Sequence, residues 1–134
     1  GTIEMKRVMT TTSHYTRHYI AYPSDDLTIT GVMHIPHGDG PFPVVILNHG
    51  YIAPERYWSG EGTWRAADHL ANRGFLTIAP DYRGWGGSDS GPSFFHTGLL
   101  TDVANLISCL PSVPQAAAQQ VGMWGHSLGW RADN

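Results

Sequence analysis

Apolar runs alternate with segments of helical spacing along most of this chain. Three short runs are apolar on both faces, Val44–Leu47, Phe75–Ala79 and Val121–Trp124, a pattern typical of buried parallel strands. Between them, Trp64–Asn72 and Thr97–Leu110 carry apolar residues at helical spacing. This order predicts an α/β fold in which parallel strands are joined by right-handed crossovers, with helices on both faces of the sheet.

Turn and cap residues mark where these elements begin and end, and a hairpin precedes them. His14–Tyr22 is β-prone, Pro23–Asp26 breaks it, and Leu27–Ile35 alternates between apolar and polar residues. The two segments therefore predict an antiparallel pair joined by a turn. Thr63 is placed to cap the first helix, and Gly74 is placed to end it.

Polar, glycine-rich loops follow the buried strands. The last one begins Gly125-His126-Ser127-Leu128-Gly129, a G-x-S-x-G pattern that puts a serine on a sharp strand-to-helix turn. In open α/β sheets, ligands bind beyond the carboxyl ends of the strands, where these loops meet. The sequence therefore predicts Ser127 as a nucleophile at that edge.

A serine that attacks a carbonyl group needs N–H donors for the oxyanion that forms. The backbone N–H of Leu128, the residue after the nucleophile, is one candidate donor. The loop Asn48-His49-Gly50-Tyr51 follows another buried strand, and Gly50 allows the backbone to turn its amides toward the site. The N–H of Tyr51 is the second candidate, and an ordinary glycine turn is the alternative interpretation of this loop.

Taken together, three segments resemble the N-terminal half of the α/β-hydrolase superfamily: Leu47–Gly50, Pro80–Asp89 and Gly125–Gly129. Their order and spacing match that family, and the likeness covers roughly residues 15–130. Within the superfamily, the form is similar to prolyl-oligopeptidase-like and dienelactone-hydrolase-like esterases and peptidases. The resemblance implies that Ser127 is the nucleophile and that the N–H groups of Tyr51 and Leu128 form the oxyanion hole.

The same resemblance implies supporting roles for residues of the loops. His49, Gly50 and Asp81 would shape the loops, and Arg83 and Asp89 would brace the loop beneath the site through hydrogen bonds. His126 would be a packing neighbour and not a member of a triad.

The sequence departs from the family pattern after the serine. The family order is Ser, then Asp or Glu, then His, but only seven residues follow Ser127 and none of them is a histidine. Trp130 stands where the family has a small residue. We therefore expect a single truncated α/β-hydrolase domain over residues 1–134, with the triad Asp and His missing from the chain. His96 is the candidate for a substitute base, because it follows the Asp81 loop and could lie near the same edge.

A domain that ends soon after the G-x-S-x-G turn has a consequence for assembly. The strand Val121–Trp124 would be left as an edge that is apolar on both faces, and such an edge pairs readily with another chain. We expect a homo-oligomer or a missing complementary segment.

Composition and charge limit the partners. The net charge is −3 and there is no basic patch, which argues against a nucleic acid partner. No apolar run approaches the roughly 18 residues of a membrane span. No signal peptide is visible, which favours a cytoplasmic location, although Gly1-Thr2 without a leading Met leaves a processed N-terminus open. The lone Cys109 excludes an internal disulfide and suits a buried thiol.

The sequence thus predicts a serine hydrolase that cleaves a small-molecule carboxylic ester through an acyl-enzyme on Ser127, with no cofactor and no metal. Peptidase activity stays open beside esterase activity. The alternative is a non-catalytic binding or interaction module that keeps the α/β-hydrolase fold.

Overall fold

A single mixed sheet forms the centre of the molecule. The computed structural model describes residues 1–50, 54–92 and 97–125. The strands are β1 (Glu4–Thr11), β2 (Tyr15–Ser24), β3 (Leu27–Pro36), β4 (Phe42–Asn48), β5 (Leu76–Pro80) and β6 (Ala116–Gly125). The helices are α1 (Trp64–Ala71), α2 (Thr97–Cys109) and the short 3-10 helices η1 (Pro54–Arg56) and η3 (Leu110–Ser112).

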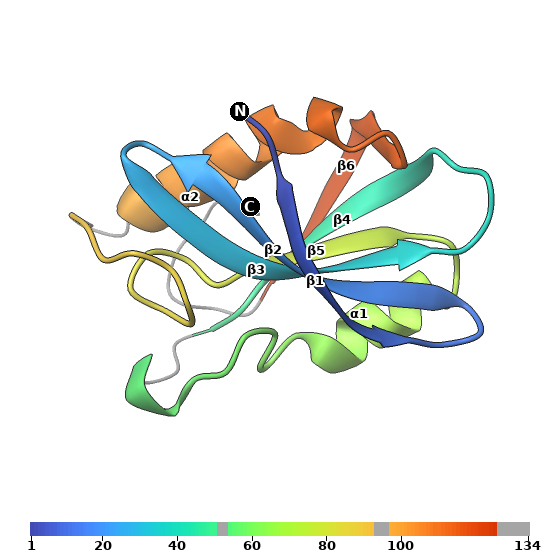
Figure 1. Cartoon of the computed structure of the whole chain (residues 1–134), viewed down its shortest axis with the longest axis horizontal. Helices are drawn as coiled ribbons and strands as arrows, with labels where there is room; N and C mark the ends of the chain where they lie inside the picture. The colour runs from blue at the N-terminus through green and yellow to red at the C-terminus, as the bar shows by residue number, and fades with distance from the viewer. Residues whose placement is uncertain (51–53, 93–96, 126–134) are drawn as a thin grey trace.

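The sheet order is β1-β2-β3-β5-β4-β6. The strands β1, β2, β3 and β5 pair antiparallel in turn, whereas β4 pairs parallel with both β5 and β6. Helix α1 lies on one face of the sheet and α2 on the other (Figure 1). The predicted hairpin and the predicted α/β arrangement of parallel strands with helices on both faces are confirmed.

The apolar core is divided unequally between the two faces. The larger cluster fills the space between the sheet and α2 and includes Met33, Ile46, Ile78 and Leu106, none of which is exposed to solvent. The buried residues of the smaller cluster, beneath α1, are Leu47, Ala67 and Ala79. The runs of apolar residues in β4 and β5 supply both clusters, because successive side chains of a strand point to opposite faces.

Helix α1 begins and ends near the predicted residues. Thr63 occupies the N-cap position, but its side chain makes no capping bond. Its Oγ1 instead donates to the carbonyl oxygen of Gly60 at 3.1 Å, so Thr63 secures the preceding turn. Beyond the helix, Gly74 has a φ of +91°, a conformation typical of a helix C-terminus.

The sequence analysis missed one strand and was wrong about the burial of another. Strand β1 was not predicted, because nearly all its residues are exposed and no apolar alternation marks it. Strand β6 begins at Ala116, and Val121–Trp124 is not buried: the exposed fractions of Met123 and Trp124 are 38% and 37%. In the part of the chain that the structure describes, β6 pairs on one side only, with β4, so its outer edge lacks the neighbour that burial requires.

Two further sequence predictions concern Cys109 and membrane-spanning helices. Cys109 is buried and unpaired, packed in the cluster beneath α2. Within the described ranges, no helix has both the length and the apolar character that a bilayer crossing demands.

Candidate functional site

The structure describes the frame of the predicted site. Ser127 and Leu128, with their neighbour His126, lie outside the described residues, and so do Tyr51 and the candidate base His96. The predicted supporting residues are all described: His49, Gly50, Asp81, Arg83 and Asp89.

The strands that lead to the two predicted halves of the oxyanion hole are neighbours. Strands β4 and β6 are parallel, and Asn48 at the end of β4 is in register with Gly125 at the end of β6. Adjacent strands lie about 4.8 Å apart. The segment that begins with His49 and the motif that begins with Gly125 therefore start side by side at one edge of the sheet.

The loops after β4 and β5 leave the sheet toward opposite faces. The chain passes from β4 through α1 to β5, and from β5 through α2 to β6 on the far side of β4. Since α1 and α2 cover different faces (Figure 1), the two loops diverge above β4 and β5. Ligands of open α/β sheets bind at such a point, outside the carboxyl ends of the strands.

His49 joins the two loops through its ring. The side chain is 1% exposed, Nδ1 lies 2.6 Å from the carbonyl oxygen of Gly50, and Nε2 lies 2.9 Å from the carbonyl oxygen of Asp81. Both partners are acceptors, so a neutral ring can donate to only one of them at a time. With carbonyl oxygens at both nitrogens, His49 is placed to hold the two loops together, and both ring nitrogens are engaged within the loops.

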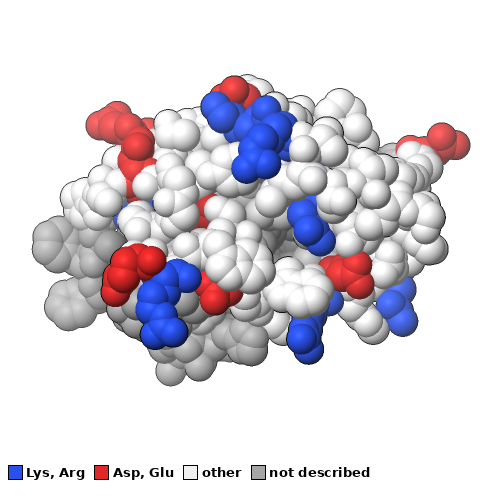
Figure 2. Space-filling model, turned by 60° about the horizontal axis from the view of Figure 1, so that its bottom comes forward, with Lys and Arg blue, Asp and Glu red and all other residues white. Residues whose placement is uncertain are grey.

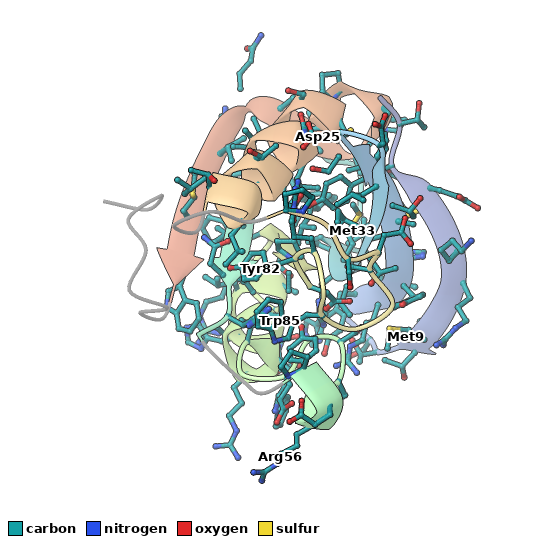
Figure 3. The ribbon with its side chains drawn as sticks, turned by 90° about the vertical axis from the view of Figure 1, so that its left-hand side faces the viewer. Met9, Asp25, Met33, Arg56, Tyr82 and Trp85 are labelled. Atoms are coloured by element: carbon teal, nitrogen blue, oxygen red, sulfur yellow. The ribbon has the colours of Figure 1, made fainter. Side chains whose placement is uncertain are left out.

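Aromatic rings surround His49. Its centroid is 4.7 Å from that of Tyr57, 4.4 Å from that of Tyr82 and 5.9 Å from that of Trp85. Tyr82 and Trp85 lie near each other between α2 and the segment that leads into α1 (Figure 3). This packing fixes the plane of the imidazole ring beyond what its hydrogen bonds achieve.

Asp81 is a fully buried carboxylate that ties three segments together. Its oxygens accept hydrogen bonds from Thr30 Oγ1 in β3 and from Tyr57 OH and Ser59 Oγ in the segment before α1, each at 2.6 Å. Burial raises the pKa of Asp81 above its ordinary value, while these three hydroxyl groups oppose the rise. Burial likewise raises the pKa of Tyr57, and the neighbouring Asp81 adds to that rise, so Tyr57 stays a donor.

The turn after Asp81 is tight. Tyr82, which is completely buried, has a φ of +71°, and such a conformation costs a bulky residue about 1–3 kcal/mol. Gly86 has a φ of +57°. A methyl group at Gly86 would collide with Asp81 Oδ2 and would lie 2.9 Å from Ser59 Oγ. The turn therefore needs glycine at this position so that the backbone can approach the buried carboxylate.

Arg83 anchors the same loop to α2. Its Nη2 lies 2.7 Å from Asp102 Oδ1, and its backbone N–H donates to Asp102 Oδ2 at 2.8 Å. Nη1 donates to the carbonyl oxygen of Pro92, and Nη2 also reaches Asp25 Oδ2 at 3.1 Å. The hydrogen bonds with Asp102 are the largest cause of the raised pKa of Arg83. The guanidinium group thus spans the loop, α2 and the β2–β3 turn.

Asp89 closes the loop against β3. Its Oδ2 accepts a hydrogen bond from the backbone N–H of Thr28 at 2.8 Å, and its own N–H donates to the Thr28 carbonyl oxygen at 2.9 Å. The loop is therefore held at Asp81, Arg83 and Asp89.

Sequence reasoning missed the partners of these residues. Asp102 carries a readable signal, because it shares the apolar face of α2 with Leu99, Val103 and Leu106, and a carboxylate on such a face needs a cationic partner. Tyr57 and Ser59 carry no such signal.

In residues 1–50, 54–92 and 97–125, no three His, Cys, Asp or Glu side chains gather so that they could hold a metal ion.

Comparison with known families and sequences gives a consistent result. A family model described as the alpha/beta hydrolase fold matches residues 43–129. The chain is similar to a lysophosphatidylserine lipase from Mus musculus, with 30% identity over 145 residues that cover 95% of this chain and 34% of the lipase. It is similar to epoxide hydrolase A from Mycobacterium tuberculosis, with 36% identity over 97 residues that cover 71% of this chain and 28% of that enzyme. The chain thus spans about a third of the length of these relatives.

Solved structures show the same fold. Acetyl xylan esterase 1 from a Thermoanaerobacterium species matches with a TM-score of 0.66 and 23% identity, over 95% of this chain and 45% of the esterase. A methylesterase matches with a TM-score of 0.68 and 21% identity, over 95% of this chain and 30% of the methylesterase. At these identities the likeness is one of fold.

Replacing Asp102 tests the anchoring of the loop. Asp102→Asn removes the charge that faces the Arg83 guanidinium, whose side chain is 5% exposed. We expect the free energy of unfolding, measured by urea denaturation, to fall by about 3 kcal/mol, because a buried cation loses its buried, charged partner. Asp25→Asn is the matched control: it pairs with the same guanidinium, but its side chain is 58% exposed, and we expect less than about 1 kcal/mol. Equal losses would contradict the assignment of Asp102 as the anchor.

Replacing Gly86 tests the approach to Asp81. Gly86→Ala and Gly84→Ala both put a side chain at a positive φ, but a Cβ at Gly84 meets nothing within 4 Å. We expect Gly84→Ala to cost about 1–2 kcal/mol of unfolding free energy from backbone strain alone. Gly86→Ala should cost about 2 kcal/mol more, because the buried carboxylate must move. The argument fails if chemical denaturation shows the two variants to be equally stable.

Proposed function

Because the chain belongs to the alpha/beta hydrolase fold family, we propose that it contributes the nucleophile Ser127 to a hydrolase of carboxylic esters. The observation that carries the proposal is the register of Asn48 with Gly125 at the ends of two parallel, neighbouring strands. The G-x-S-x-G motif and the His49-Gly50 segment leave those two ends, as a serine nucleophile and one wall of its oxyanion hole require.

The proposed reaction is acyl transfer in two steps. Ser127 Oγ attacks the ester carbonyl carbon while its proton passes to a general base, and the N–H groups of Leu128 and Tyr51 stabilise the oxyanion. The bond to the alcohol oxygen then breaks, and that oxygen takes the proton. Water attacks the acyl-serine in the same way, which releases the carboxylic acid and restores the hydroxyl of Ser127.

The described loops serve this reaction as a rigid frame. His49 joins the loops after β4 and β5, and Asp81 holds the segment before α1 against β3 through three hydroxyl groups. Donors that are fixed in place before the charge develops need no reorganisation at the moment of reaction, which is the source of most oxyanion stabilisation. Arg83 extends the frame to α2.

The general base is proposed to be a residue other than His49, whose two nitrogens already contact carbonyl oxygens. We propose that the histidine and its carboxylate partner are supplied from outside the described residues, by another segment or another copy of the chain. His96 is the alternative candidate within this sequence, to be tested against such an external base. The names of the lipase and the esterases among the relatives support an ester substrate.

A fluorophosphonate probe tests the nucleophile. We expect slow covalent labelling at Ser127 that Ser127→Ala abolishes, because an oxyanion hole retains about 10³-fold catalysis or more without a complete triad. Ser108→Ala is the control, since the exposed Ser108 hydroxyl donates to the Ala104 carbonyl oxygen within α2, and it should label like the parent chain. If the folded chain neither labels nor turns over a short-chain p-nitrophenyl ester, the non-catalytic binding module becomes the better interpretation.

A pair of histidine variants tests the source of the base. We expect His96→Asn to change the labelling rate of Ser127 by less than about twofold, because the proposed base lies elsewhere. His69→Asn, at an exposed position of α1, is the matched control. A drop of about 10²-fold or more in His96→Asn alone would instead assign the base to His96.

A further inference from the structure

A hollow lies on the α1 side of the sheet, beside the segment that leads into α1. It is enclosed by residues of β1, β2, β3, β5 and α1 and has a volume of about 370 Å³, counting the part open to solvent. Figure 2 turns this side of the molecule toward the viewer and shows the face hollowed near its middle, with a basic side chain beside the hollow.

Exposed apolar side chains line the hollow. The exposed fractions are 53% for Trp58, 43% for Trp64 and 37% for Met9, and all three residues belong to its lining. They come from β1, from the segment before α1 and from the start of α1. Large apolar groups that gather at one concave place, instead of being scattered singly, mark binding sites.

Arg17 and His34 are among the polar side chains that line the hollow. They are cross-strand neighbours in β2 and β3, and Arg17 Nε donates to His34 Nε2 at 3.0 Å. Since Nε2 is the acceptor of this bond, the neutral ring of His34 carries its proton on Nδ1. Burial is the main reason that the pKa of His34 falls to about 4, so the ring is neutral at pH 7.

His34 Nδ1 is a buried donor without an acceptor. The residue is 2% exposed, and Nδ1 has no hydrogen-bond partner within the described ranges. A buried polar group of this kind is costly. The permanently charged Arg17 makes no ion pair with any carboxylate of the described residues. Cation and donor therefore stand together beside apolar walls.

We propose that this hollow binds a small organic carboxylate whose body is aromatic or short aliphatic. The carboxylate would pair with the charge of Arg17, and the body would lie against Trp58, Trp64 and Met9. An ionised acceptor suits this cation better than a neutral one, because hydrogen bonds between charged groups are roughly twice as strong. The proposal does not depend on Ser127 and goes beyond ester hydrolysis.

Two neighbouring groups bear on the proposal. Asp68 is the nearby acid, and its Oδ1 already accepts a hydrogen bond from Tyr15 OH at 2.6 Å. Thr77, the cross-strand neighbour of His34 in β5, has a buried Oγ1 that likewise has no partner in the described part of the chain. A water molecule between Thr77 and His34 is the competing occupant, and it would need no carboxylate.

Calorimetric titration of the chain with sodium benzoate tests the site, with Trp fluorescence as a second readout. We expect a dissociation constant of about 1 mM or tighter. The isosteric neutral amide benzamide should bind about tenfold more weakly. Arg17→Met keeps the apolar stem of the side chain but loses the charge, and it should weaken benzoate about tenfold. Arg7→Met is the matched control, because Arg7 lies over Tyr19 in the adjacent part of the sheet and does not line the hollow.

The outcomes separate the occupants. Benzoate binding that Arg17→Met weakens and Arg7→Met leaves unchanged supports the proposal. Equal binding of benzoate and benzamide, equal effects of the two arginine variants, or no binding to a chain whose circular dichroism spectrum is that of the parent overturns it and leaves the hollow to water. Running the titration in Ser127→Ala keeps this result separate from the fate of the proposed ester hydrolysis.

Discussion

The buried carboxylate of Asp81 is the constraint on which the loops of this molecule depend. A carboxylate in a dry environment requires hydrogen-bond donors, and three hydroxyl groups from two distant segments supply them. Satisfying Asp81 therefore fixes where the segment before α1 meets β3. The turn behind it carries the tight backbone at Tyr82 and Gly86, and both the His49 contact and the Arg83 anchor follow from that turn.

The sequence predicted the elements whose burial leaves a pattern. Strands β4 and β5 are apolar on both faces because helices cover both, and α1 and α2 carry apolar residues at helical spacing for the same reason. Strand β1 escaped prediction because it is held by pairing with β2 and buries little of its own surface. The burial of Val121–Trp124 was wrong because apolar composition reports what a strand can bury, and not whether a neighbour covers it.

Some residues of the candidate site could likewise be predicted from the sequence, and others could not. The positions of His49, Gly50 and Asp81 could be predicted from their place after apolar strands, since the carboxyl ends of parallel strands meet at one edge. The hydroxyl partners of Asp81 could not, because Tyr57 and Ser59 reach it only through the path of a loop. Asp102 was predictable in part. Its position on the apolar face of α2 indicates a buried charge, but its partner Arg83 can be identified only from the fold.

The unequal cores on the two faces of the sheet have a consequence for motion. The apolar cluster beneath α1 has two alanines and one leucine as its buried residues, whereas a large cluster joins α2 to the sheet. The free energy that opposes local opening grows with the apolar surface that an element buries. The layer of α1 is thus expected to detach from the sheet at a lower energetic cost than α2. Its backbone amides should then exchange with solvent ahead of those in α2.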